Sequence, residues 1–145
     1  MESISIFDML KIGVGPSSSH TLGPWRAAMR FMDELSVVHD VASISIIDVN
    51  LYGSLSLTGA GHATDIAVVM GLRGCDPATY PVENIGADIE EIKSSHKLML
   101  ADGHTIDFHW DENICFNRNF LSFHPNGMSF SAFIGGEVIT ETYYS

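Results

Sequence analysis

Apolar residues recur at helical spacing in several stretches of the chain, and the clearest of these follows Pro16. Such spacing places the apolar side chains on one face of a helix. The residues on that face are Leu22, Trp25, Met29, Met32 and Leu35. Pro24 is compatible with this helix because it falls in the first turn, where its missing N–H is not needed. Three further helices are predicted: one capped by Ser3 or Ser5 that runs to Lys11, a buried one that begins in "HATD" and ends at Gly71 or Gly74, and a more exposed one over residues 84–100.

β-Branched residues and shorter alternations predict the strands. A core strand is expected over residues 44–51, where the alternation breaks once near Ile47, and a glycine-rich loop follows it. Three shorter strands are expected over residues 105–110, 128–133 and 137–143, with turns at "HPNG" and "GG". The sum is an α+β fold in which helices pack on one face of a mainly antiparallel sheet.

Length and composition narrow the class of protein. A chain of 145 residues that is 46% hydrophobic predicts a single globular domain over residues 1–145. The 18 acidic and 7 basic side chains give a net charge of −11, which disfavours nucleic acid and membrane surfaces as partners. The absence of a signal peptide or spanning segment in this sequence predicts a cytoplasmic protein.

The two cysteines, Cys75 and Cys115, belong to no Cys-x-x-Cys or Cys/His ligand pattern. The sequence therefore predicts neither a disulfide framework nor a metal site on this chain. Both cysteines are interpreted as small hydrophobic residues of the interior.

The stretch "GVGPSSSHTLGPW" places three serines, a histidine and a threonine directly before the predicted helix. The first N–H groups of a helix have no partner within it, and its dipole is positive there, so this stretch offers donors to a carboxylate or a phosphate. Hydroxyl residues before a helix also serve as ordinary caps, and the residues alone leave both interpretations open.

His62 lies in "TGAGHATD", where glycines allow close approach of a ligand and a helix begins. A neutral imidazole in this position suits a general base, and the alternative is a histidine that only forms hydrogen bonds in its loop. His124 in "FHPNG" joins Asn126 and the hydroxyls of "YYS" as a further polar group. His104 and His109 fall on opposite faces of a predicted strand, which makes them a poor pair of metal ligands.

Four motifs carry a family resemblance: "SIFDMLKIGVGPSSSHTLGP", "DVNLYGSLSLTGAGHATDIAVVMGL", "HPNGM" and "TYYS". They closely resemble the N-terminal β domain of bacterial iron–sulfur L-serine dehydratases of the one-chain type. In that family an α domain follows and supplies the cysteines of a [4Fe–4S] cluster, so the chain ending at Ser145 resembles a fragment. The β domain is similar in fold to the allosteric substrate binding domain of D-3-phosphoglycerate dehydrogenase, and this likeness leaves an effector-binding domain as the alternative.

The resemblance implies conversion of L-serine to pyruvate and ammonia, assisted by the cluster iron as a Lewis acid. It implies His62 as the base, although His20 fits that role equally well. It implies a substrate grip formed by Ser17, Ser18, Ser19, His20 and Thr21, with contributions from His124, Asn126 and Tyr143. The expected partners are L-serine, the α domain of the same chain and a second copy in a homo-oligomer. No cofactor is expected on this chain, and we expect the chain alone to be inactive.

Overall fold

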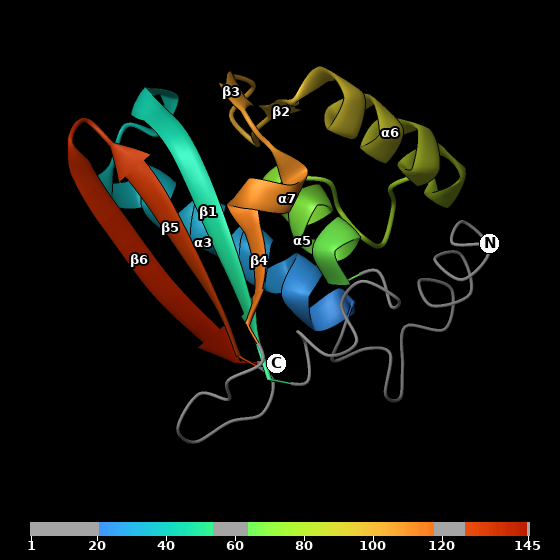
Figure 1. The fold of residues 1–145 in the computed structure, drawn as a ribbon, viewed down its shortest axis with the longest axis horizontal. Coiled ribbons are helices and arrows are strands. Elements are labelled where there is room, and N and C mark those ends of the chain that lie inside the picture. The colour runs from blue at the N-terminus through green and yellow to red at the C-terminus, as the bar shows by residue number, and fades with distance from the viewer. Residues whose placement is uncertain (1–20, 54–63, 118–126, 145) are drawn as a thin grey trace.

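The computed structural model describes residues 21–53, 64–117 and 127–144, and a four-stranded sheet in the order β4-β1-β5-β6 forms its centre (Figure 1). β1 (Ile44–Tyr52), β5 (Gly127–Ile134) and β6 (Glu137–Tyr144) are antiparallel neighbours, whereas β4 (Ile114–Asn117) joins β1 in parallel. β2 (Lys97–Met99) and β3 (Thr105–Asp107) form a separate antiparallel pair. The prediction of a mainly antiparallel sheet is therefore confirmed.

The helices that cover the sheet lie on one of its faces, as predicted (Figure 1). α3 (Leu22–Val38) and α5 (Thr64–Leu72) form this layer. α6 (Ile85–Ser95) and the short α7 (Trp110–Asn113) lie beside β2 and β3, and two single turns of 3-10 helix, η1 (Val41–Ser43) and η2 (Val82–Asn84), precede β1 and α6. This α+β arrangement confirms the predicted fold class.

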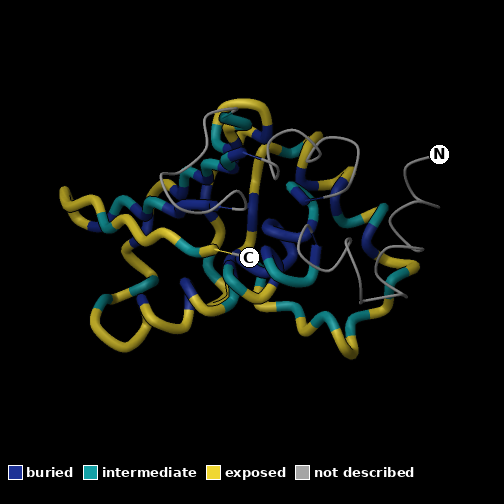
Figure 2. Tube along the Cα trace, turned by 90° about the horizontal axis from the view of Figure 1, so that it is seen from below, coloured by how far each residue is buried: buried dark blue, intermediate teal, exposed yellow. Residues whose placement is uncertain are grey.

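The core between the helices and the sheet follows from the alternation along the strands. Val49 and Leu51 of β1 are fully buried, and they pair with Phe130 and Met128 of β5 on the same face. The ring of Phe130 stacks on Phe31 of α3 with centroids 5.1 Å apart. Buried residues accordingly gather in the middle of the molecule, and exposed residues follow its outline (Figure 2). The strand register shifts between Ile44 and Ile46, close to the predicted break in alternation.

α3 and α5 approach each other closely at Gly71. A Cβ at this position would lie 2.3 Å from the carbonyl oxygen of Trp25 and 2.7 Å from the Cβ of Ala28, so only glycine fits. The same tryptophan donates its indole N–H to the carbonyl of Cys75 at 2.8 Å. Backbone contact through a glycine therefore fixes the position of one helix against the other.

Two element boundaries differ from the prediction. The helix expected over residues 84–100 ends at Ser95, because His96 adopts a left-handed conformation (φ 58°) and donates its N–H to the carbonyl of Ile92. Residues 97–99 then form β2, which pairs with β3. The strand expected over residues 105–110 ends at Asp107, since Trp110 begins α7. Tertiary pairing overrides the local helical spacing in this region.

Three expectations are not tested by the described residues. The helix that runs to Lys11 lies outside them. The single-domain organisation and the likeness to the allosteric substrate binding domain stay predictions.

Candidate active site

Four strand ends meet at one end of the sheet. Tyr52 at the end of β1 pairs with Asn117 at the end of β4, and the N–H of Gly53 donates to the carbonyl of Asn117 at 3.2 Å. Gly127 at the start of β5 pairs with Tyr144 at the end of β6. These ends meet near the label C in Figure 1. We call this the loop end of the sheet, and we define it by these five residues.

Most of the predicted site residues lie in segments that the structure does not describe. Each of these segments adjoins residues that the structure does describe. His62 lies between Gly53 and Thr64, and both His124 and Asn126 lie between Asn117 and Gly127. The structure thus brings together Asn117 and Gly127, which flank the segment with His124 and Asn126. Gly53, which precedes the segment with His62, lies at the same end of the sheet. Ser17, Ser18, Ser19 and His20 also lie outside the described residues and directly precede Thr21.

Thr21 is the described member of the predicted substrate grip. It occupies the N-cap of α3 and is buried, and its carbonyl accepts the N–H of Trp25 at 2.9 Å. Its side chain does not make the usual cap hydrogen bond to the helix backbone. The predicted start of the helix is confirmed, whereas an ordinary side-chain cap by Thr21 is not what the structure shows.

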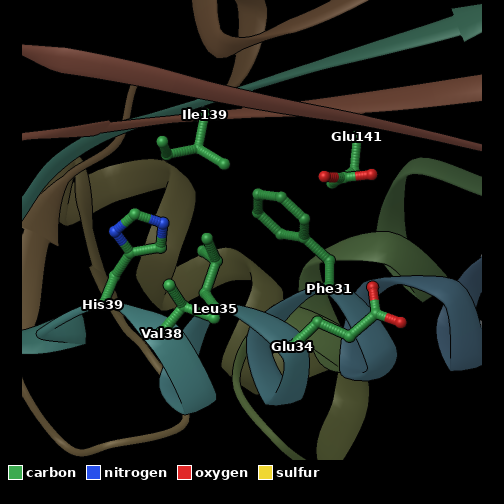
Figure 3. Close-up of a pocket in the computed structure, with 7 residues that line it drawn as sticks. All are labelled: Phe31, Glu34, Leu35, Val38, His39, Ile139 and Glu141. Atoms are coloured by element: carbon green, nitrogen blue, oxygen red, sulfur yellow. The ribbon is translucent and has the colours of Figure 1, made fainter.

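Tyr143 is the other described candidate, and its hydroxyl points to α3. The hydroxyl donates to Oε1 of Glu34 at 2.6 Å, and the other oxygen of Glu34 accepts from Nε of Arg30 at 2.9 Å. Burial, followed by this contact with Glu34, raises the pKa of Tyr143. The hydrogen bond from Tyr143, followed by that from Arg30, lowers the pKa of Glu34, which borders a groove between α3 and β6 (Figure 3). Tyr143 is thus a protonated donor held by α3, and its contact with substrate stays a prediction.

Asp65, which the sequence analysis did not single out, is a half-buried carboxylate in the first turn of α5. It accepts the indole N–H of Trp110 at 3.2 Å and the backbone N–H of Ile66 at 3.0 Å. Lys93 of α6 lies 4.7 Å from the centroid of the Trp110 ring. Burial raises the pKa of Asp65, and the hydrogen bond from Trp110 opposes that rise. The sequence signal was only an acidic residue in a first helical turn, since its partner is distant along the chain.

We predict opposite effects on stability for two substitutions of Asp65. Asp65→Ala leaves the buried indole N–H of Trp110 without its acceptor and should lower the free energy of unfolding by about 1–3 kcal/mol. Asp65→Asn retains an acceptor and removes the charge. Folding raises the pKa of Asp65 above its ordinary 3.8. The free energy of unfolding therefore falls as the pH rises from the unfolded to the folded pKa and the buried carboxyl ionises.

Asp65→Asn should therefore gain stability relative to the unmodified protein as the pH is raised from about 4 to 7. Urea unfolding of both proteins across this range measures the difference. A difference that stays constant with pH would show that the buried charge is not penalised.

A polar row crosses the open face of the sheet next to the loop end. Asn50 of β1 pairs with Ser129 of β5, which pairs with Thr142 of β6. Their neighbours along each strand face the helices, so these three side chains lie on the opposite face. Ser129 is nevertheless only 6% exposed. Alternation along a single strand does not reveal such a row, because it depends on the pairing of three strands.

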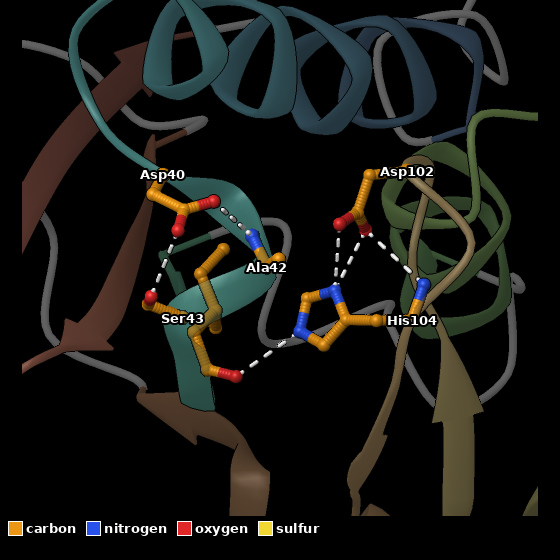
Figure 4. Close-up of polar contacts among 6 residues, drawn as sticks. Asp40, Ala42, Ser43, Asp102 and His104 are labelled. Atoms are coloured by element: carbon orange, nitrogen blue, oxygen red, sulfur yellow. Dashed lines mark hydrogen bonds and ion pairs between the residues drawn. The ribbon is translucent and has the colours of Figure 1, made fainter.

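The described histidines have structural contacts. His104 has Nδ1 at 2.8 Å from both carboxylate oxygens of Asp102 and Nε2 at 3.1 Å from the carbonyl oxygen of Ile44 (Figure 4). These contacts connect the turn before β3 to the start of β1. His109 stacks on His96 with centroids 4.5 Å apart. His104 and His109 lie on either side of β3 rather than within one strand, so the predicted geometry of opposite strand faces is wrong for this pair.

The family of the chain follows from a match to a protein-family model. The model described as serine dehydratase beta chain matches residues 5–145. The chain belongs to this family. The resemblance inferred from the loop motifs is thereby confirmed.

Bacterial relatives of this serine dehydratase beta chain support the assignment. L-serine dehydratase 1 of Escherichia coli is 46% identical over 144 residues, which are 98% of this chain and 32% of that protein. L-serine dehydratase of Streptomyces coelicolor is 45% identical over 146 residues, covering 99% of this chain and 32% of that protein. L-serine dehydratase of Helicobacter pylori is 40% identical over 147 residues, covering 100% of this chain and 32% of that protein. The chain thus spans about a third of the length of these relatives.

Both cysteines of this serine dehydratase beta chain lie in the described part of the structure and are free. Cys75 is half-buried, and neither cysteine forms a disulfide. Cys115 is exposed, so its interpretation as a residue of the interior is wrong. Across residues 21–53, 64–117 and 127–144, no three histidine, cysteine or acidic side chains are grouped to hold a metal ion. None of the helices in these ranges is long and apolar enough to cross a membrane.

Proposed function

We propose that this chain is the substrate-contacting β domain of an L-serine dehydratase, which converts L-serine to pyruvate and ammonia. The support is the family and the name shared by relatives that match nearly all of this chain. Because the chain covers only a third of those proteins, the complete activity requires an α domain as partner. We further propose that the enzyme acts in amino-acid degradation in the cytoplasm.

The loop end of the sheet is the observation that carries the role of this domain. The segment with His124 and Asn126 leaves β4 and enters β5 there, and the segment with His62 leaves β1 there. Side chains from distant parts of the sequence are thereby attached to one rigid edge. Catalytic groups are commonly carried in this way by loops on a fixed scaffold.

The proposed chemistry needs an anion grip and a base. Ser17, Ser18, Ser19, His20 and Thr21 hold the substrate carboxylate with hydroxyls and with N–H groups at the start of α3. His62 takes the proton from Cα, and the β-hydroxyl leaves with a proton as water. The resulting enamine tautomerises to an imine, which water hydrolyses to pyruvate and ammonia, so the water released is consumed again.

A [4Fe–4S] cluster bound by the α domain would supply a Lewis acid for the leaving hydroxyl. In this proposal the ligands of the cluster belong to the α domain. The remaining candidates, His124, Asn126 and Tyr143, are proposed to contact the substrate beside the grip.

The test is reconstitution from separate domains. We expect the purified 145-residue chain to form no pyruvate from L-serine, and we expect activity when the α domain with its cluster is added. Pyruvate formation by the iron-free chain alone would contradict the proposal. Titration of L-serine into the isolated chain by NMR distinguishes the alternative, because an effector domain would bind it without the α domain.

A further inference from the structure

The short helix α7 connects the start of α5 to the sheet. Its first residue, Trp110, donates the indole N–H to Oδ2 of Asp65 in the first turn of α5 at 3.2 Å. Its last residue, Asn113, donates from Nδ2 to Oδ1 of Asp48 in β1 at 2.7 Å. The same amide accepts the N–H of His109 at 2.7 Å, which fixes its orientation. Because β4 follows α7 directly, these contacts hold the start of α5 against both β1 and β4 (Figure 1).

The indole of Trp110 is held in one orientation by its other neighbours. Trp110 is 9% exposed, and its ring meets that of the buried Phe108 edge-on, with centroids 6.2 Å apart. Nζ of Lys93 in α6 lies 4.7 Å from the centroid of the indole, a distance at which a cation is attracted to an aromatic ring. The indole N–H is therefore directed at Asp65 by contacts that do not involve Asp65.

The carboxylate of Asp65 is oriented from its own helix as well. Oδ1 accepts the backbone N–H of Ile66 at 3.0 Å, which leaves Oδ2 for Trp110. The positive end of the helix dipole favours an acidic side chain in this turn. Burial raises the pKa of Asp65, and the two N–H groups and the charge of Lys93 oppose that rise. A half-buried carboxylate with a fixed N–H on each oxygen forms a precise connection between two elements, and the proposed mechanism gives it no role.

This connection lies between the attachment points of two candidate segments. The segment with His62 ends where α5 begins, one residue before Asp65. The segment with His124 and Asn126 follows β4, which begins directly after α7. A shift of α5 against α7 would therefore move one attachment point relative to the other. Misplacement of a reacting group by about 1 Å can lower a rate by about 10²-fold.

We propose that Asp65 is a positioning residue for the dehydration of L-serine. Through its hydrogen bond with Trp110, it fixes the start of α5, and with it the attachment of the segment that carries His62, against α7 and β4. This role rests on the proposed function of the domain. Asp65 acts through the hydrogen bond rather than through its charge, so asparagine, which offers the same kind of acceptor, can replace it.

The experiment is steady-state kinetics of the complete enzyme with L-serine. Asp65→Ala and Trp110→Phe each remove one partner of the hydrogen bond and should lower kcat by about 10- to 100-fold. KM should change by less than about threefold, because the proposed grip is attached to α3. Asp65→Asn should keep kcat within about threefold, since its amide oxygen still accepts the indole N–H. The double variant should be no slower than the slower single variant, because both changes break one bond.

Asp102→Ala is the matched control. Asp102 also contacts a ring nitrogen, Nδ1 of His104 at 2.8 Å, but it lies in the turn before β3 and is not connected to the candidate segments. Its replacement should leave kcat nearly unchanged. Circular dichroism under the assay conditions gives the folded fraction of each variant, and kcat is expressed per folded enzyme so that lost stability alone does not lower it.

Three results would overturn the role of Asp65 while leaving the proposed function intact. They are a normal kcat in Asp65→Ala, an equal loss in Asp65→Asn and Asp65→Ala, and fully additive losses in the double variant. A loss in Asp102→Ala as large as that in Asp65→Ala would also overturn it. Absence of pyruvate with the unmodified complete enzyme would instead overturn the proposed function, and the role of Asp65 with it.

Discussion

Replacing His62 by alanine in the complete enzyme is expected to lower kcat for L-serine by about 10²- to 10⁴-fold, the range typical of a lost general base. If His62 removes the Cα proton, the variant should also lose exchange of that proton with solvent deuterium. Binding of the substrate carboxylate should change much less, because the proposed grip consists of other residues. Steady-state kinetics and deuterium exchange followed by NMR measure these effects.

His20→Ala and His109→Ala complete the experiment. His20 is the other histidine that fits the role of base, so a larger loss of proton exchange in His20→Ala than in His62→Ala would transfer the role. His109 is exposed and stacks on His96, outside the candidate loops, and its replacement should leave kcat nearly unchanged. Near-normal kcat in His62→Ala would contradict the assignment directly.

Gly71→Ala is expected to lower the free energy of unfolding by about 2–3 kcal/mol, as overpacking of a tight contact does. The added methyl group would lie 2.3 Å from the carbonyl oxygen of Trp25, a backbone atom that moves only if α3 and α5 separate. The melting temperature should fall by about 10 °C for a domain of this size. Thermal unfolding followed by circular dichroism measures the change.

Gly86→Ala provides the matched control, because the same substitution in α6 meets no atom within 4 Å. Alanine has the higher helix propensity, so this variant should be unchanged or more stable by up to about 1 kcal/mol. Equal effects of the two substitutions would show that the close approach at Gly71 does not limit stability. In the complete enzyme, Gly71→Ala should also lower activity, since α3 and α5 directly follow the segments that carry the grip and His62.

Much of the fold was predictable because its longer elements carry their own periodicity. The apolar spacing from Leu22 to Leu35 predicts α3, and the paired glycines between two alternating runs predict the hairpin of β5 and β6. The short strands were not predictable in this way. β2 and β4 have three and four residues, too few for a period to be recognised, and their existence depends on pairing with β3 and β1.

In the candidate site, too, features carried by continuous sequence were predictable, and contacts between distant residues were not. Loop motifs pointed to His62, the grip and the family, because each motif is a continuous piece of sequence. Asp65 was missed, since its partner Trp110 comes from an element far along the chain. The contact of Tyr143 with Glu34 was missed for the same reason.

The sequence by itself determined the α+β class, the main helices and strands, and membership of the serine dehydratase family, because these depend on local spacing and on continuous motifs. The tertiary structure alone decided which strands are neighbours, with the order β4-β1-β5-β6, and which ends of these strands meet. Strand order and side-chain partners depend on contacts between residues distant in the chain. Such contacts are selected by the total packing of the fold, which no local pattern records.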